Sequence, residues 1–448
     1  MTLSPDNLCQ ALLDAAQNAG ADAADVIVVT GRSVSIDIRG GALEHAERSE
    51  STDLGLRVLL GQKQAIVSTS DGRPGALAKM AERAVAMAKE ALDDPFAGLA
   101  DASQLASDRD CAALELADPT PEPSPETLQQ DALAAEAAAM AIDGVSQVQA
   151  AAASYGTSTV HLAASNGFSG GYDRTSRSIS CVAIGGTGSG MERDYDGDSR
   201  VFQSDLRSAD EIGTRAAKRA VERLGARKPT TGTWPVLFDE RLSSSLIGHL
   251  ISAANGASVA RGSSWLLDLL GKPVLPDTLS LIEDPHRPRI GGSRLFDAEG
   301  LPTKRRAIVE NGILTGWTLD LSSARKLGMT STANAVRGPS GPPSPSVGNL
   351  SLTQGSQSRA DLLRDMGTGL LVTSMIGSTI NPNTGDYSRG AAGFWVENGE
   401  LAYPVNECTI AGNLADMLRR IIPANDARAY LSRVVPSLLI EGMSLAGA

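Results

Sequence analysis

Residues 384–413, TGDYSRGAAGFWVENGELAYPVNECTIAGN, carry the clearest structural signals in the chain. Asn398-Gly399 separates two apolar runs within residues 394–405. This pair favours a tight hairpin turn, because both residue types tolerate positive φ. The polar cluster DYSRG, residues 386–390, comes just before the hairpin. We therefore expect a loop bearing Asp386, Tyr387 and Arg389 that leads into a stiff hairpin.

Beyond residues 228–233, KPTTGT, the pattern predicts a C-terminal β-rich domain at residues 234–448. It contains hairpins and one central helix at 242–255. A second Asn-Gly turn, Asn311-Gly312, predicts a hairpin at 307–319. Residues 337–349, RGPSGPPSPSVGN, contain four prolines and predict a stiff loop. This loop is either a rigid surface feature or the wall of a cleft.

The first half of the chain shows the same order of elements twice. Helical spacing starts at Ser4-Pro5 and again at Ser124-Pro125, with helices returning near 76–92 and after Ser208. Strand-like alternation lies between the helices, at 25–29, 33–38, 53–60, 64–69, 145–154, 157–165 and 168–184. The order predicts an α+β fold. Its N-terminal domain, residues 1–228, would have a mixed or antiparallel sheet and a possible duplication.

Composition excludes several classes of function. The formal net charge is -12, which repels phosphate backbones, so we expect no direct nucleic-acid binding. No apolar run reaches the length of a membrane span, and residues 1–20 lack the pattern of a signal peptide. The four cysteines are far apart and form no C-x-x-C. This spacing indicates reduced thiols rather than disulfides. Because reduced thiols are typical of the cytosol, we expect a cytoplasmic protein.

The residues that bind metals in proteins are sparse. The chain has four histidines, His45, His161, His249 and His286, and no H-E-x-x-H. Asp194, Asp196 and Asp198 have the spacing of a calcium loop. Ser199, however, occupies the position that needs glycine, so a solvated loop is expected. GGTGSG at 185–190 lacks dinucleotide-binding spacing and predicts a bend between strands.

Several long strings resemble one known family. They are DPHRPR at 284–289, FDAEGLPTKRRAIVENGIL at 296–314, GDYSRGAAGFWVENGELAYPV at 385–405 and the final run from 439. All four resemble the TldD/PmbA family, and its PmbA (TldE) branch in particular. The resemblance covers nearly the whole chain.

The resemblance also implies where a metal site would be. The catalytic TldD branch carries H-E-x-x-x-H before an Arg-Gly-Ser/Thr-Ser segment, which here is RGSS at 261–264. Ile247 and Ser252 stand at the two histidine positions and Gly248 at the glutamate. His249 is out of register, and residues 423–436 hold no cysteine for the third ligand. The resemblance thus implies no catalytic residue, metal or cofactor here, with zinc in the partner subunit.

The function implied by the resemblance is a subunit of a cytosolic metallopeptidase complex. It would act with a zinc-bearing TldD-type partner, degrading unfolded peptides or trimming peptide-antibiotic precursors. One alternative is a homodimeric peptide-binding protein that cuts nothing. Another is a modulator of DNA gyrase acting through protein contacts.

The candidate substrate-binding residues are His249, Arg337, Asp386, Tyr387 and Arg389. Tyr387 and Arg389 could hold a peptide, since arginine offers a planar fork of donors. Alternatively, Asp386 and Arg389 could pair and pin the hairpin.

Overall fold

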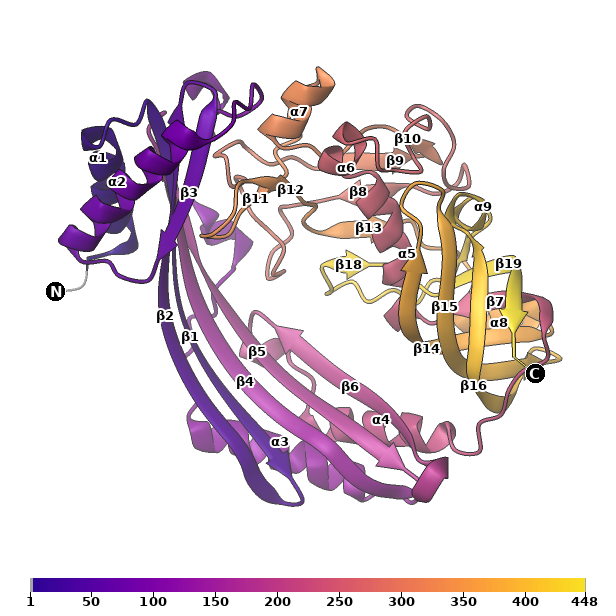
Figure 1. Cartoon of the computed structure of the whole chain (residues 1–448). Coiled ribbons are helices and arrows are strands. Elements are labelled where there is room, and N and C mark those ends of the chain that lie inside the picture. Colours follow the sequence, from indigo (N-terminus) through magenta and orange to yellow (C-terminus); the bar gives the residue numbers. More distant parts are fainter. Residues whose placement is uncertain (1–2, 448) are drawn as a thin grey trace.

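A long curved sheet wraps around a barrel-containing C-terminal domain in this computed structural model, which describes residues 3–447 (Figure 1). The sheet contains β1 Ala23–Arg39, β2 Ala42–Leu60, β3 Lys63–Thr69, β4 Val145–Ala164, β5 Ser169–Gly185 and β6 Glu192–Arg200. Its strand order is β3-β2-β1-β4-β5-β6, and every neighbouring pair is antiparallel. The α+β class expected from the sequence is confirmed.

Four helices cover the outer, convex face of this sheet (Figure 1). They are α1 Pro5–Asn18, α2 Pro74–Glu90, α3 Pro125–Met140 and α4 Ala209–Glu222. The side chains of Ser4, Ser124 and Ser208 accept backbone N–H groups at the starts of α1, α3 and α4. Helix, three strands and helix therefore occur twice in succession, the order that suggested a duplication.

Two separate cores explain the unusual length of the strands. One end of the sheet packs on α1 and α2 through residues such as Val26 and Leu56. The other end packs on α3 and α4 through residues such as Ile36 and Ile179. Between the two cores the strands carry polar residues. In the sequence these polar stretches interrupt the apolar alternation, so one long strand was predicted as two short ones. The predicted breaks at 30–32 and 155–156 are wrong, because β1 and β4 continue across them.

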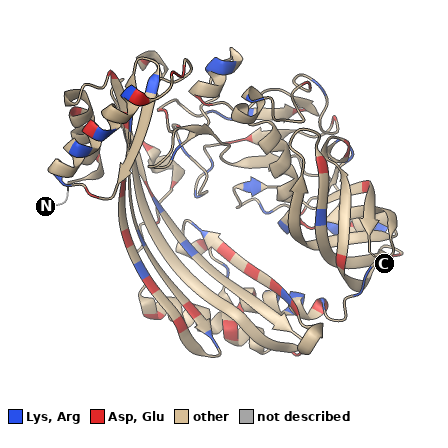
Figure 2. Cartoon of the chain, viewed as in Figure 1, with Lys and Arg blue, Asp and Glu red and all other residues tan. Residues whose placement is uncertain are grey.

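The triplet Asp194, Asp196 and Asp198 is also corrected. These residues lie in β6 and are buried beneath α4, where the acidic residues follow the strand (Figure 2). Asp196 pairs with Arg207 at 2.7 Å and with Arg219 at 3.0 Å. A spacing of two residues points all three carboxylates at the arginines. The predicted solvated loop is therefore an ion-paired strand, whereas the predicted bend at 185–190 is confirmed.

The C-terminal domain is built on a five-stranded barrel. Its strands are β7 Gly232–Phe238, β14 Gly369–Ile380, β15 Asp386–Glu397, β16 Glu400–Asn413 and β19 Leu438–Ala446, and the pairing of β16 with β19 closes it. The short strand β17 Ile422–Pro423 pairs antiparallel with β19. Asn311-Gly312 and Asn398-Gly399 both have positive φ, which confirms the two predicted hairpin turns.

A smaller sheet and short helices complete this domain. The sheet contains β10 Ile313–Leu314, β9 Arg306–Glu310, β8 Leu281–Glu283, β13 Leu350–Leu352 and β18 Arg433–Val434, and β11 Ala335–Val336 pairs with β12 Ser344–Pro345. The expected central helix is α5 Glu240–Ala253. The structure adds α6 Gly256–Ala260, α7 Leu321–Leu327, α8 Arg359–Met366 and α9 Leu414–Leu418. Single 3-10 turns occur at Ala102–Gln104, Cys111–Leu114, Gly188–Gly190 and Gln203–Asp205.

A buried ion cluster joins the two domains. Asp25 of β1 accepts hydrogen bonds from Arg57 of β2 and forms an ion pair with Arg337 of the C-terminal domain. The Arg337 side chain is 0% exposed. Beside it, a Cβ on Gly55 would lie 2.2 Å from the Pro339 carbonyl oxygen, so only glycine allows this approach. The proline loop at 337–349 thus lies against the sheet rather than free on the surface.

Loss of Arg337 should unfold the protein more easily. In Arg337→Ala, the buried carboxylate of Asp25 keeps only one of its two arginine partners. Removing one partner of a buried ion pair typically lowers the free energy of unfolding by about 3 kcal/mol or more. Urea unfolding of the full chain measures the change. Arg73→Ala is the control, since Arg73 pairs with Asp71 on the surface. Equal stability of the two variants would show that the buried cluster contributes little.

A second prediction concerns Glu299, which lines a hollow of about 320 Å³ between the domains together with Arg57. Burial, with help from nearby Asp297, raises the pKa of Glu299 to about 8. The folded state therefore holds this proton more tightly than the unfolded state, and stability should fall as pH rises from about 4.5 to 8.

Glu299→Gln tests this directly. The variant should be more stable than the natural chain at pH 9 and nearly equal to it at pH 5, as followed by melting temperature. A melting temperature that falls equally in both proteins between these pH values would assign the loss to other groups.

Candidate functional site

The candidate site lies on helix α5. Asp239 caps the helix by accepting the backbone N–H of Arg241. Leu246, Ile247 and Leu250 pack into the core of the C-terminal domain. The opposite side carries residues that are small or polar, namely Ser245, Gly248, His249 and Ser252. The core-facing residues thus determine which side of α5 is open to a ligand.

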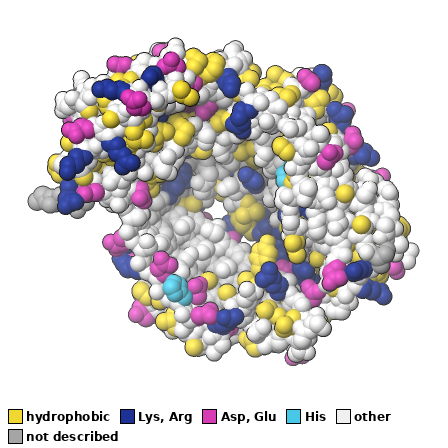
Figure 3. Space-filling view, in the orientation of Figure 1, with side chains coloured by type: hydrophobic (Ala, Val, Ile, Leu, Met, Phe, Trp, Pro, Cys, Tyr) yellow, Lys and Arg dark blue, Asp and Glu magenta, His cyan; other side chains and the backbone are white. Residues whose placement is uncertain are grey.

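This polar side of α5 faces the inside of the molecule. Figure 1 shows α5 and β18 on the side of the C-terminal domain that faces the concave face of the long sheet. The space-filling view is hollowed between them (Figure 3). Strand alternation places Ser33 and Ser35 on the concave face, because Val34 and Ile36 point to the outer helices. The wall opposite α5 is therefore polar rather than apolar.

Three of the predicted residues come together. The rings of His249 and Tyr387 meet edge to face with centroids 5.9 Å apart. Burial lowers the pKa of His249, and the charge of Arg389 lowers it further. The imidazole is therefore neutral at pH 7. Its Nε2 is buried and has no hydrogen-bond partner within residues 3–447, and the same is true of Ser245 Oγ.

The predicted loop at 386–390 is wrong. These residues open strand β15, so successive side chains point to opposite faces. Tyr387 and Arg389 point to the α5 side. Asp386 points away and accepts hydrogen bonds from Thr384 at 2.6 Å and Asn413 at 3.3 Å. The alternative in which Asp386 pairs with Arg389 is wrong as well, since Arg389 Nε donates to the Gly377 carbonyl at 2.8 Å.

Two candidate residues are structural. Tyr387 is 2% exposed, its hydroxyl lies 3.4 Å from Met375 Sδ, and burial raises its pKa to about 12. It supports the ring of His249 and offers no surface to a ligand. Arg337 is buried in the ion cluster between the domains and cannot reach a substrate there. The predictions that Tyr387 and Arg337 bind substrate are therefore corrected.

Sequence reasoning missed Arg433. This exposed residue of β18 places a guanidinium nitrogen 3.4 Å from where a Cβ on Gly248 would be. In the described part of the chain its side chain makes no hydrogen bond or ion pair. Arg428, in the same segment, instead pairs with Glu240 at 2.8 Å. The only signal in the sequence was that residues 423–436 carry two arginines where the resemblance implied a cysteine.

The α5 side chains do not fit a zinc ion. Isoleucine and glycine offer no ligand atom, and Ile247 is 1% exposed within the core. Across residues 3–447, no three His, Cys, Asp or Glu side chains gather closely enough to hold a metal ion. His161 and His286 bond to Ser169 and Thr303, at 3.0 and 3.1 Å, away from α5.

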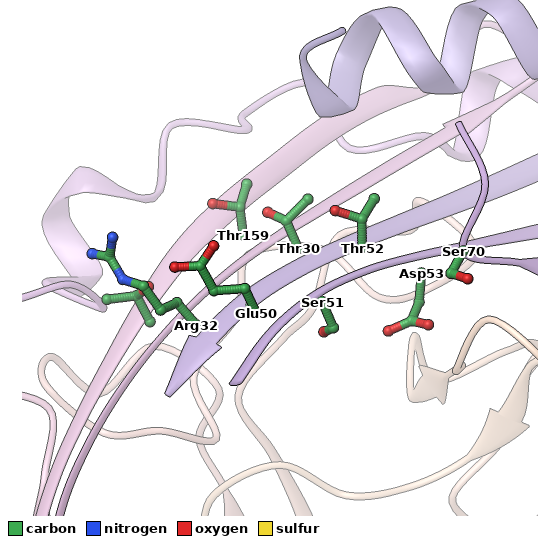
Figure 4. A pocket seen from close by; sticks show the side chains of 10 residues that line it. Thr30, Arg32, Glu50, Ser51, Thr52, Asp53, Ser70 and Thr159 are labelled. Carbon is green, nitrogen blue, oxygen red and sulfur yellow. The ribbon is translucent and has the colours of Figure 1, made fainter. Parts of the chain in front are cut away.

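A separate hollow of about 730 Å³ lies on the long sheet (Figure 4). The row Thr159, Thr30 and Thr52 crosses three neighbouring strands, next to Arg32 and Glu50. These side chains lie on the outer face, between the two pairs of helices, and so away from α5. They include no buried group without a hydrogen-bond partner, and we assign the hollow no function.

Comparison with known proteins identifies the family. Residues 231–447 match the PmbA/TldA metallopeptidase C-terminal domain, 118–224 the central domain and 24–88 domain 1. Metalloprotease PmbA of Escherichia coli O157:H7 is 38% identical over 95% of this chain and 92% of its own length. A PmbA homolog of Haemophilus influenzae is also 38% identical, over 97% and 94%.

Solved structures show the same fold. A Bacteroides thetaiotaomicron protein, described as a modulator of DNA gyrase, superposes with a TM-score of 0.91 at 27% identity, covering 99% of this chain and 98% of its own. TldE of Thermococcus kodakarensis superposes with a TM-score of 0.84 at 20% identity, over 98% and 100%. Among residues 3–447, no helix is long and apolar enough to cross a membrane. The chain belongs to the PmbA/TldD metallopeptidase family, on its PmbA side.

Proposed function

We propose that this chain is the non-catalytic subunit of a cytoplasmic metallopeptidase complex. It would act with a zinc-bearing TldD-type subunit and hold unfolded peptides for cleavage. The observation that carries the proposal is helix α5. One side of it is packed into the core, and the other carries Gly248, His249 and Ser252 toward the hollow between the helix and the long sheet (Figure 3). Within residues 3–447, no three potential ligand side chains gather there to hold a metal ion.

The geometry also favours peptide holding over chemistry. His249 and Ser245 have buried polar atoms that lack partners, as expected where a ligand or ordered water completes the hydrogen bonding. Arg389 and Arg433 have free guanidinium nitrogens. These groups bind and orient an anionic or polar ligand. The position that holds the glutamate of the catalytic branch is Gly248 here, which has no side chain to take up a proton.

Reconstitution tests the proposal. The chain alone should not cleave an unfolded peptide such as reduced, alkylated casein fragments, and should hold less than stoichiometric zinc by elemental analysis. Adding a TldD-type subunit should produce cleavage that a chelator abolishes. One tightly held zinc per chain, or cleavage by the chain alone in the presence of chelator, would contradict the proposal. Binding of casein fragments without cleavage in any mixture would favour the homodimeric peptide-binding alternative.

Arg389→Ala should lower cleavage by the reconstituted complex while changing stability little. Arg389 makes one hydrogen bond through Nε, so its removal should cost within about 1 kcal/mol of stability. Initial cleavage rates and melting temperature are measured on the same preparation. Asp386→Asn is the matched control on the same strand, since its side chain faces away from α5. A lower melting temperature with unchanged cleavage per folded complex would mean that Arg389 only secures the strand.

A further inference from the structure

We propose that Arg433, Arg389 and His249 form a binding site for a carboxylate, namely the C-terminal carboxylate of an extended peptide. The inference rests on the proposed function, because it assumes that peptides enter the space beside α5. It adds which end of the peptide is held and by which residues.

The donors available at this place fit a carboxylate. Arg433 has a free, exposed guanidinium beside Gly248, and arginine matches the two oxygens of a carboxylate with parallel N–H groups. Arg389 uses only Nε in a protein contact, which leaves its terminal nitrogens. His249 Nε2 and Ser245 Oγ are buried without partners one turn apart on the same helix. All four groups can donate to an anion.

The surroundings make this cationic place unusual. The chain as a whole carries a net charge of -12. Many of its arginines form ion pairs with carboxylates in the structure. For example, Arg207 before α4 and Arg215 and Arg219 on α4 all form ion pairs with Asp196. Within residues 3–447, neither Arg433 nor Arg389 forms an ion pair with a carboxylate, and Arg389 donates only to the Gly377 carbonyl. The missing negative charge is what a ligand would supply.

Gly248 provides the space for such a ligand. A Cβ there would touch the Arg433 guanidinium at ordinary van der Waals distance, so no side chain fills the gap between helix and arginine. Glycine inside a helix is otherwise unfavourable relative to most residues. A glutamate at this position would place its own carboxylate on Arg433 and close the site from within.

The experiment compares two fluorescein-labelled decapeptides of Gly, Ser and Ala, one with a free C-terminal carboxylate and one amidated. Fluorescence anisotropy with the full chain should give tighter binding of the free carboxylate, on the order of tenfold, as expected for charge-assisted hydrogen bonds. Arg433→Gln and Gly248→Glu should remove the preference. Arg83→Gln, the same change at an exposed arginine of α2, should keep it, and Gly248→Gln separates the added charge from the added volume.

Equal binding of both peptides to the natural chain would overturn the carboxylate site. So would a preference that survives in Arg433→Gln. Melting curves show whether each variant is folded. If Arg433→Gln does not fold, Gly248→Glu still tests the site, because it changes the same place from the helix side. The proposed function is tested separately, by measuring whether the chain and the TldD-type subunit together show cleavage that a chelator abolishes. That cleavage can persist when the carboxylate preference is absent, so the two failures are distinguishable.

Discussion

The carboxylate of Asp25 holds the two domains in their relative position. Arg57 from the neighbouring strand and Arg337 from the C-terminal domain both compensate its charge, away from water. Separation of the domains would leave Arg337 without its partner and Asp25 with only Arg57, since Asp25 and Arg57 belong to the same domain. Gly55 adds a steric condition, because the Pro339 backbone approaches too closely for any side chain. The position of the barrel above the sheet depends on this contact.

The far end of the sheet makes a second polar contact with the barrel domain. Arg241, at the start of α5, bonds to Asp194 of β6 at 2.9 Å, and Asn406 bonds to Glu192 at 2.7 Å. The C-terminal domain is thus attached near both ends of the curved strands, with the hollow between them (Figure 3). Because Arg241 also belongs to α5, the contact that closes this end of the hollow helps to position the helix that faces it.

The site on α5 follows from the same architecture. The apolar side of the helix is buried, so its polar side must face the hollow, and the buried Tyr387 ring orients His249. Arg433 lies on β18, far from α5 in the sequence, and its guanidinium lies beside Gly248. A place that lacks metal ligands therefore keeps a defined shape and a positive charge. This is the physical basis for assigning it to binding rather than to chemistry.

Local chemistry determined much of this protein from sequence alone. Asn-Gly pairs specified two hairpin turns and serine caps specified helix starts. At the metal-motif positions the sequence has Ile247, Gly248 and Ser252 in place of two histidines and a glutamate. Only the tertiary structure decided which charged residues are buried. Arg337 and the Asp194–Asp198 triplet look like solvent-exposed groups in the sequence, yet both are buried against opposite charges. Arg337 meets Asp25 from the other domain, whereas the aspartates meet arginines that follow them in the chain. Arg433 has no local pattern at all, since its role depends on meeting a glycine of α5 in space.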